Sequence, residues 1–265
     1  MSWVVAPVFA EELAPLQMGV LPYLSSERLF EYFLPMKDYL ELKLQRRIVM
    51  STAPNFKVYV QRAAHGDYDI YQTAPHFALL AETGSGYRRV SRLMRELDGS
   101  VVVRRDSAVR RPEDLRGRIV ITPDELAITS MLGEQLLQDH GLTSGKDYRI
   151  VRAASHNNAI ITVYRGEADA ALTSSAEFEN AAPEVVRELR LLTKTRKVPH
   201  MMIMAHPRLS AVEYERLKRA LLAFTRDGAG HRFFEITGYG DMGTITDADM
   251  ARLQPFLQHL KERVR

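Results

Sequence analysis

The sequence predicts an α/β protein of two lobes, each built on an open and mostly parallel β-sheet flanked by helices. Between residues 16 and 205, short apolar runs alternate with amphipathic stretches, which is the pattern of strand–helix–strand units. Two extended segments interrupt this alternation and would carry the chain into a second lobe and back. After His206 and Pro207 the sequence is nearly all helical. We expect lobe 1 at residues 16–100, lobe 2 at 101–197, a return to lobe 1 with C-terminal helices at 198–265, and crossings near 98–105 and 194–200.

In the first lobe the elements follow from apolar periodicity and from residues that cap or break helices. Ser25 or Ser26 can cap the first helix, whose apolar side chains recur at helical spacing, and Pro35 inside it predicts a kink or a break. Gly66 and Asp67 mark the turn before the third strand. We expect strands at 16–21, 48–51, 68–71 and 88–95, and helices at 25–44, 55–64 and 75–83.

The second lobe opens on an uninterrupted valine run, Val101 to Val103, that is typical of a strand. Pro112 begins a single predicted helical turn that ends at Gly117 and leads into the next strand. Strand and helix patterns then alternate until the helical tail begins. We expect strands at 100–104, 118–122, 148–152, 169–173, 189–192 and 201–205, and helices at 129–140, 156–165, from Ser175, 210–226, 229–236 and 247–264.

Composition excludes several classes of function. The chain has 265 residues, of which 46% are hydrophobic and 26% charged, as in an ordinary globular protein. Its net charge is only +3 and its arginines are scattered, so we expect no nucleic-acid partner. The absence of cysteine removes disulfides, thiolate nucleophiles and cysteine metal ligands. The eight histidines lack metal-ligand spacing, and no nucleophile elbow or phosphate-binding glycine loop is present. We therefore expect no metal, no cofactor and no enzyme activity.

The first ten residues are apolar and are followed by Glu11 and Glu12. Val8 and Ala10 fit the small-residue pattern that precedes signal-peptide cleavage, although a basic start and half of the usual apolar core are missing. We interpret residues 1–10 as the end of a truncated export signal, which predicts a periplasmic protein. The alternative is an unstructured N-terminus of a cytoplasmic protein.

Four junctions join an apolar run to the start of a predicted helix and carry hydroxyl or histidine side chains. A helix N-terminus has unpaired backbone N–H groups and the positive end of the helix dipole, which favours an anion. Hydroxyl and imidazole groups add uncharged donors. Open α/β sheets bind ligands outside the carboxyl ends of their strands, and the junctions fall at such ends, two in each lobe. The junctions at residues 19–25, 73–76, 127–131 and 153–158 therefore predict a cleft for a compact anion.

Several segments match a known protein family in their order and spacing. They are Gly-Val-Leu-Pro-Tyr at 19–23, Thr-Ala-Pro-His-Phe-Ala at 73–78, residues 107–120, Ser-His-Asn-Asn-Ala at 155–159 with residues 165–171, and Val-Pro-His at 198–200. Over about residues 16–256 the chain resembles the periplasmic phosphate-, phosphite- and phosphonate-binding proteins of ABC importers. The resemblance implies the type II periplasmic-binding-protein fold, with two lobes and a hinge of two crossings.

The resemblance also implies a function and a set of site residues. We expect a monomeric protein that captures phosphonate, phosphite or phosphate by lobe closure and delivers it to an ABC permease. In relatives the oxyanion is held by an aromatic residue of the first junction, by hydroxyls that open a helix of the second lobe, and by a histidine. By resemblance these roles fall on Tyr23, Thr129, Ser130 and His156, and Thr73 would add a hydroxyl from lobe 1. The residues expected around them are Tyr71, His76, Ser155, Asn157 and His200.

The chain departs from the family pattern in two places. Relatives that bind aminophosphonates place a carboxylate just after the proline of the return crossing, whereas here Pro199 is followed by His200 and two methionines. This departure argues against aminoethylphosphonate as the ligand. Asp124 and Glu125 precede the second-lobe junction and would repel an anion if they faced the cleft. A sensory partner of a membrane histidine kinase is the alternative function, and an enzyme is less well supported.

Overall fold

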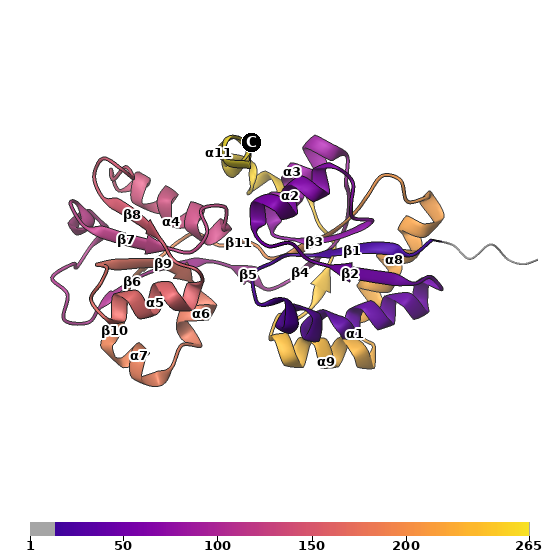
Figure 1. The fold of residues 1–265 in the computed structure, drawn as a ribbon, viewed down its shortest axis with the longest axis horizontal. Helices are drawn as coiled ribbons and strands as arrows, with labels where there is room; N and C mark the ends of the chain where they lie inside the picture. The colour runs from indigo at the N-terminus through magenta and orange to yellow at the C-terminus, as the bar shows by residue number, and fades with distance from the viewer. Residues whose placement is uncertain (1–13, 265) are drawn as a thin grey trace, which may run out of the picture.

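The computed structural model describes residues 14–264 and shows two lobes, each with a sheet between layers of helices (Figure 1). The predicted export-signal segment, residues 1–10, lies outside the described residues. We call the part built on the six-stranded sheet lobe 1 and the part built on the five-stranded sheet lobe 2. In residues 14–264 no helix combines the length and the apolar character needed to cross a membrane.

Lobe 1 contains β1 (Leu16–Val20), β2 (Ile48–Ser51), β3 (Ile70–Thr73), β4 (Arg88–Leu93), β12 (Met202–Ala205) and β13 (Met242–Gly243). Their order in the sheet is β13-β4-β12-β3-β1-β2. β1 pairs in parallel with β2 and β3, whereas β12 is antiparallel to both β3 and β4. The strands β1 to β4 therefore share one direction, and the sheet is mostly parallel, as predicted.

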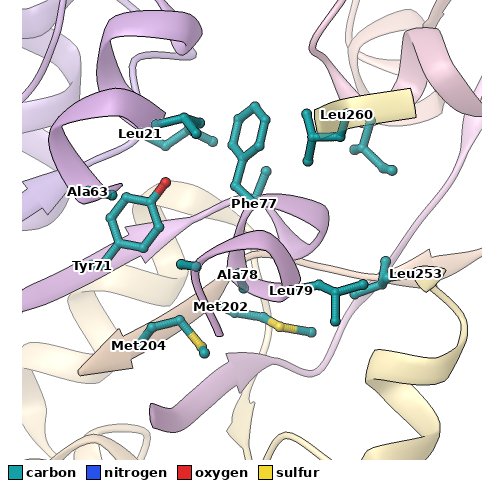
Figure 2. Close-up of a cluster of buried hydrophobic side chains, with 14 of the residues drawn as sticks. Leu21, Ala63, Tyr71, Phe77, Ala78, Leu79, Met202, Met204, Leu253 and Leu260 are labelled. Carbon is teal, nitrogen blue, oxygen red and sulfur yellow. The ribbon is translucent and has the colours of Figure 1, made fainter. Parts of the chain in front are cut away.

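Helices cover both faces of the lobe 1 sheet. α1 (Ser26–Leu44), α8 (Ala211–Phe224) and α9 (Gly228–Thr237) bury apolar side chains on one face. α2 (Phe56–Ala64), α3 (Pro75–Ser85) and α11 (Gln254–Val264) do so on the other. Figure 2 shows part of this second cluster, in which Phe77 of α3 and Leu260 of α11 point into one apolar region.

Lobe 2 contains β6 (Gly99–Arg104), β7 (Ile119–Thr122), β8 (Arg149–Arg152), β9 (Ala170–Ser174) and β10 (Leu189–Lys194), in the order β10-β6-β9-β7-β8. β7 is parallel to β8 and β9, and β6 is antiparallel to β9 and β10, so four strands again share a direction. α4 (Ile128–Asp139) packs on one face, while α5 (His156–Tyr164) and α7 (Pro183–Glu188) pack on the other. Two short elements complete the lobe, the 3-10 turn Pro112–Leu115 and α6 (Ser175–Glu179).

The two lobes are joined by an antiparallel pair of short strands, β5 (Glu96–Leu97) and β11 (Val198–Pro199). The second strand lies within the predicted crossing at 194–200. The first crossing runs from residue 94 to 98 and meets the predicted region 98–105 only at its start, because residues from Gly99 onward already pair in the lobe 2 sheet.

Three local expectations need correction. α1 continues through Pro35, so this proline does not split the helix. The expected helix at 247–264 is divided into α10 (Asp247–Ala251) and α11, because Pro255 lacks an N–H group and its ring clashes with a carbonyl of the preceding turn. β13 was not expected, since a strand of two residues carries no periodicity.

Candidate ligand-binding cleft

A cleft between the lobes contains two chambers that share Tyr23. The first, which we call the His156 chamber, has a volume of about 540 Å³. The second, the His200 chamber, has a volume of about 740 Å³. Residues lining the His156 chamber include Tyr23, Phe56, Asp124, Glu125, Arg152, Ser155 and His156, and those lining the His200 chamber include Tyr23, Arg28, Arg95, Glu177, Lys197, His200 and Tyr239.

Tyr23 lies in the loop between β1 and α1, and its hydroxyl is hydrogen-bonded to the hydroxyl of Tyr239 at 2.5 Å. Burial raises the pKa of both phenols, so both stay protonated at physiological pH. One proton is used between the two oxygens and the other can be donated elsewhere. Tyr239 was missed from the sequence; Gly238 and Gly240, both with positive φ, place it in a tight turn, but glycines on either side do not indicate what the side chain between them contacts.

His156 is the first residue of α5, where Ser155 caps the helix by accepting the Asn158 N–H at 3.1 Å. The imidazole Nδ1 accepts the backbone N–H of Ser174 at 3.1 Å and lies 3.1 Å from Thr173 Oγ1. A backbone N–H only donates, so Nδ1 carries no proton and Nε2 must carry it. Burial lowers the pKa of His156 to about 4. His156 is therefore a neutral N–H donor in its chamber.

His200 is held in the same tautomer by a different contact. Its Nδ1 accepts the backbone N–H of Met201 at 2.9 Å, which leaves the proton on Nε2. Burial, with a smaller contribution from the Arg95 charge, lowers the pKa of His200 to about 4. Each chamber thus contains one neutral imidazole donor, with Tyr23 between them.

Thr73 and Thr129 are buried, and neither hydroxyl has a hydrogen-bond partner among the described residues. Thr73 ends β3 just before α3, and Thr129 lies in the first turn of α4. Neither helix has a side-chain hydrogen bond from its N-cap residue in the part of the chain that the structure describes, so the first N–H groups are left without a side-chain cap there. Neither threonine is among the described residues that line the two chambers. They are polar groups at two helix starts that lack a hydrogen-bond partner within residues 14–264.

The hydroxyl of Ser130 is already engaged. It donates to the carbonyl of Asp124 at 2.8 Å and lies 2.6 Å from Thr122 Oγ1. A serine hydroxyl has one proton, so Ser130 has none left for an anion. This geometry favours a role in holding the loop before α4. The sequence could not reveal it, because it depends on where the Asp124 carbonyl points.

The remaining expected residues are dispersed. His76 is buried, and its Nε2 donates to the carbonyl of Leu126 at 2.8 Å, across the boundary between the lobes. Tyr71 lies inside the apolar cluster of Figure 2, where its hydroxyl has no partner among the described residues. Asn157 is exposed. The structure thus brings Tyr23, Ser155 and His156 to one chamber and His200 to the other, while His76, Tyr71 and Asn157 lie outside both linings.

Carboxylates do line the cleft, but most of them have partners. Glu125 accepts from Arg152 at 3.1 Å, and Asp124 accepts the backbone N–H of Leu126 at 2.8 Å. Glu179 is paired with Lys194 at 2.9 Å in the His200 chamber. Glu177, which also lines the His200 chamber, is near enough to Tyr23 and Tyr239 for its charge to contribute to their raised pKa values.

Comparison with known proteins gives one family and a group of similar folds. The family model described as the periplasmic substrate-binding protein of a phosphonate ABC transporter matches residues 18–250. PhnD1 from Prochlorococcus marinus, solved in complex with methylphosphonate, has a TM-score of 0.81 at 15% identity and covers 93% of this chain and 98% of its own.

Two further solved structures are similar over nearly the whole chain. The binding-protein component of an ABC phosphonate transporter from Pseudomonas aeruginosa has a TM-score of 0.79 at 14% identity, over 95% of this chain and 89% of its own. A Xanthomonas citri protein bound to ATP has a TM-score of 0.80 at 19% identity. The match covers 94% of this chain and 99% of its own. These likenesses confirm the expected two-lobed fold of periplasmic binding proteins.

Proposed function

The chain belongs to the family of periplasmic substrate-binding proteins of phosphonate ABC transporters, and from this premise we propose that it captures a small phosphonate-type oxyanion between its lobes. Proteins of this family are periplasmic transporter components that bind a small molecule and serve a permease; they are not enzymes. Beyond this general role of the family, we propose which ligand is bound, which residues contact it, and that the lobes close around it. Phosphonate, phosphite and phosphate are the candidate ligands.

The observation that carries the proposal is the protonation state of His156. Its Nε2–H is a neutral donor whose tautomer is fixed by the Ser174 N–H, so it can bind an oxyanion without first taking up a proton. Thr73 and Thr129 offer hydroxyls that no described side chain uses. Tyr23 adds a phenol proton. Tyr23 belongs to lobe 1 and His156 to lobe 2, and both line the same chamber, so one anion that contacts both would stabilise the closed cleft by its greater affinity for that state.

The methylphosphonate complex of PhnD1 supports this class of ligand, since that protein shares the fold over nearly its whole length. The substituent of a phosphonate would lie toward the His200 chamber, beyond Tyr23. Glu177 lines that chamber, and its carboxylate could form an ion pair with the ammonium group of an aminophosphonate. Its position in the sequence differs from that in aminophosphonate-binding relatives, where the carboxylate follows the proline that corresponds to Pro199. A measured preference for aminoethylphosphonate over methylphosphonate would assign Glu177 to the ammonium and contradict the argument from the return crossing.

The test is isothermal titration calorimetry with methylphosphonate, phosphite, phosphate, aminoethylphosphonate and sulfate. We expect at least one phosphorus oxyanion to bind and His156→Ala to weaken that binding at least tenfold, about 1.4 kcal/mol for a hydrogen bond to a charged group. The control is His231→Ala, because His231 is exposed on α9 and outside both chambers. Binding of none of these anions by the wild-type protein, or unchanged affinity in His156→Ala, would contradict the proposal.

A further inference from the structure

The loop between β7 and α4, residues 123–127, lines the His156 chamber and has an unusual set of contacts. Three consecutive backbone carbonyls of this loop accept hydrogen bonds from side chains. Ser130 donates to Asp124 O from the same lobe. The other two donors belong to lobe 1. Arg263 Nη1 donates to Glu125 O at 2.6 Å, and His76 Nε2 donates to Leu126 O at 2.8 Å.

Arg263 makes a second contact with lobe 2. Its Nη2 lies 2.9 Å from Glu134 Oε2 on α4, and the two side chains are only 16% and 17% exposed. One planar guanidinium therefore serves two acceptors of the other lobe, a geometry that lysine does not reproduce. α11, which carries Arg263, is fixed to lobe 1 because Phe256 and Leu260 are buried in the same apolar cluster as Phe77. In Figure 1, α11 lies between α3 of lobe 1 and α4 of lobe 2.

Apolar contacts exclude water from the same region. Leu126, Ile128 and Met131 of lobe 2 are buried in one cluster with Phe77 and Leu253 of lobe 1. A hydrogen bond shielded from water by such a cluster is stronger than an exposed one. The contact between the lobes thus combines an apolar layer with two directed donors.

We propose that His76 and Arg263 form a latch between the lobes that sets how long a ligand is retained, without touching the ligand. Both donors reach carbonyls that lie on the opposite lobe, so their hydrogen bonds exist only while the lobes are together. Contacts made in only one of two states shift the equilibrium toward that state. Loss of the latch therefore lowers the affinity for every ligand by the same factor, because the latch changes the equilibrium of lobe closure and makes no contact with the ligand.

The test compares Arg263→Met with Lys261→Met. Both substitutions remove one positive charge from α11, but among residues 14–264 Lys261 has no hydrogen bond or ion pair with lobe 2. Solution X-ray scattering without ligand should give a larger radius of gyration for Arg263→Met than for wild type or Lys261→Met. Stopped-flow measurements with methylphosphonate and phosphite should give dissociation rates about tenfold higher, by the same factor for each anion. Arg263→Lys should be intermediate, because it keeps the charge beside Glu134 and loses the second donor.

Two results would overturn the latch. One is a variant that melts at a lower temperature but keeps the wild-type radius of gyration and dissociation rates, which would make Arg263 a structural residue only. The other is a different factor for each anion, which would place Arg263 in ligand recognition. The ligand measurements rest on the proposed function, but the scattering does not. If the wild-type protein bound none of the anions, the proposed function would fail while scattering still decided the latch.

Discussion

Lowering the pH from 8 to 5 should strongly destabilise this protein, because three of its histidines, two of them buried and one partly buried, are held in the neutral form. Burial lowers the pKa of His76, His156 and His200 to about 4, against 6.5 for an ordinary histidine. Between these values the unfolded chain binds more protons than the folded chain. The free energy of unfolding therefore falls as the pH falls through about 6.5 and continues to fall toward 4.

The magnitude follows from linkage. At pH 5 an unfolded histidine with a pKa of 6.5 is almost fully protonated, whereas a folded one with a pKa near 4 is mostly neutral. Each such group then contributes about 2 kcal/mol less stability at pH 5 than at pH 8. The three together give about 6 kcal/mol, which is comparable with the whole stability of a typical protein, about 5–15 kcal/mol.

The assay is urea unfolding followed by far-ultraviolet circular dichroism at pH 8, 7, 6 and 5. Carboxylates with lowered pKa values, such as Glu41 and Glu96, lose their contribution at lower pH, so this range isolates the histidines. His156→Gln should reduce the pH dependence by about 2 kcal/mol. The exposed His231→Gln should leave it unchanged. A free energy of unfolding that is flat between pH 8 and 5 would refute neutral burial, and with it the fixed donor at His156.

Two substitutions test other parts of the structure. Arg92→Met should destabilise the protein by about 3 kcal/mol in urea unfolding, because it leaves the buried carboxylate of Asp249, which lies 3.0 Å from Arg92 Nε, without its cation. A loss of under about 1 kcal/mol would mean that the hydrogen bonds from Thr246 are enough to stabilise the Asp249 carboxylate. Tyr239→Phe should weaken methylphosphonate binding about fivefold in calorimetry, since it removes the hydroxyl that orients Tyr23; unchanged affinity would show that this orientation does not matter for binding.

The fold could be predicted from the sequence because its signals are local. Alternating apolar runs and capped helices place nearly every strand and helix, and the two extended crossings indicate two lobes. The direction of the first four strands in lobe 1 follows from the same alternation. β13 was not predicted because a strand of two residues is too short to show a period, whereas the break before α11 was missed although Pro255 marks it in the sequence.

The cleft could be predicted only in part. Tyr23 and His156 lie in two of the predicted junctions, their roles were expected from the family resemblance, and both line the cleft. Tyr239 and Arg263 were missed, because their contacts span 216 residues for Tyr239 with Tyr23 and 138 for Arg263 with Glu125. Whether a hydroxyl is free, as for Thr129, or used, as for Ser130, depends on the direction of a single carbonyl group. Spacing along the chain carries no information on that direction.

The position of β12 has a consequence for the order in which the protein folds during synthesis. β3 and β4 are not paired with each other; β12, which follows the whole of lobe 2 in the chain, lies between them. The lobe 2 sheet, in contrast, comes from the continuous stretch 99–194. A sheet cannot be completed before its central strand has been synthesised, so the lobe 1 sheet can form fully only after residue 205 has left the ribosome. By then all the strands of lobe 2 have been made. The half of the molecule that is translated first is therefore the last to be completed.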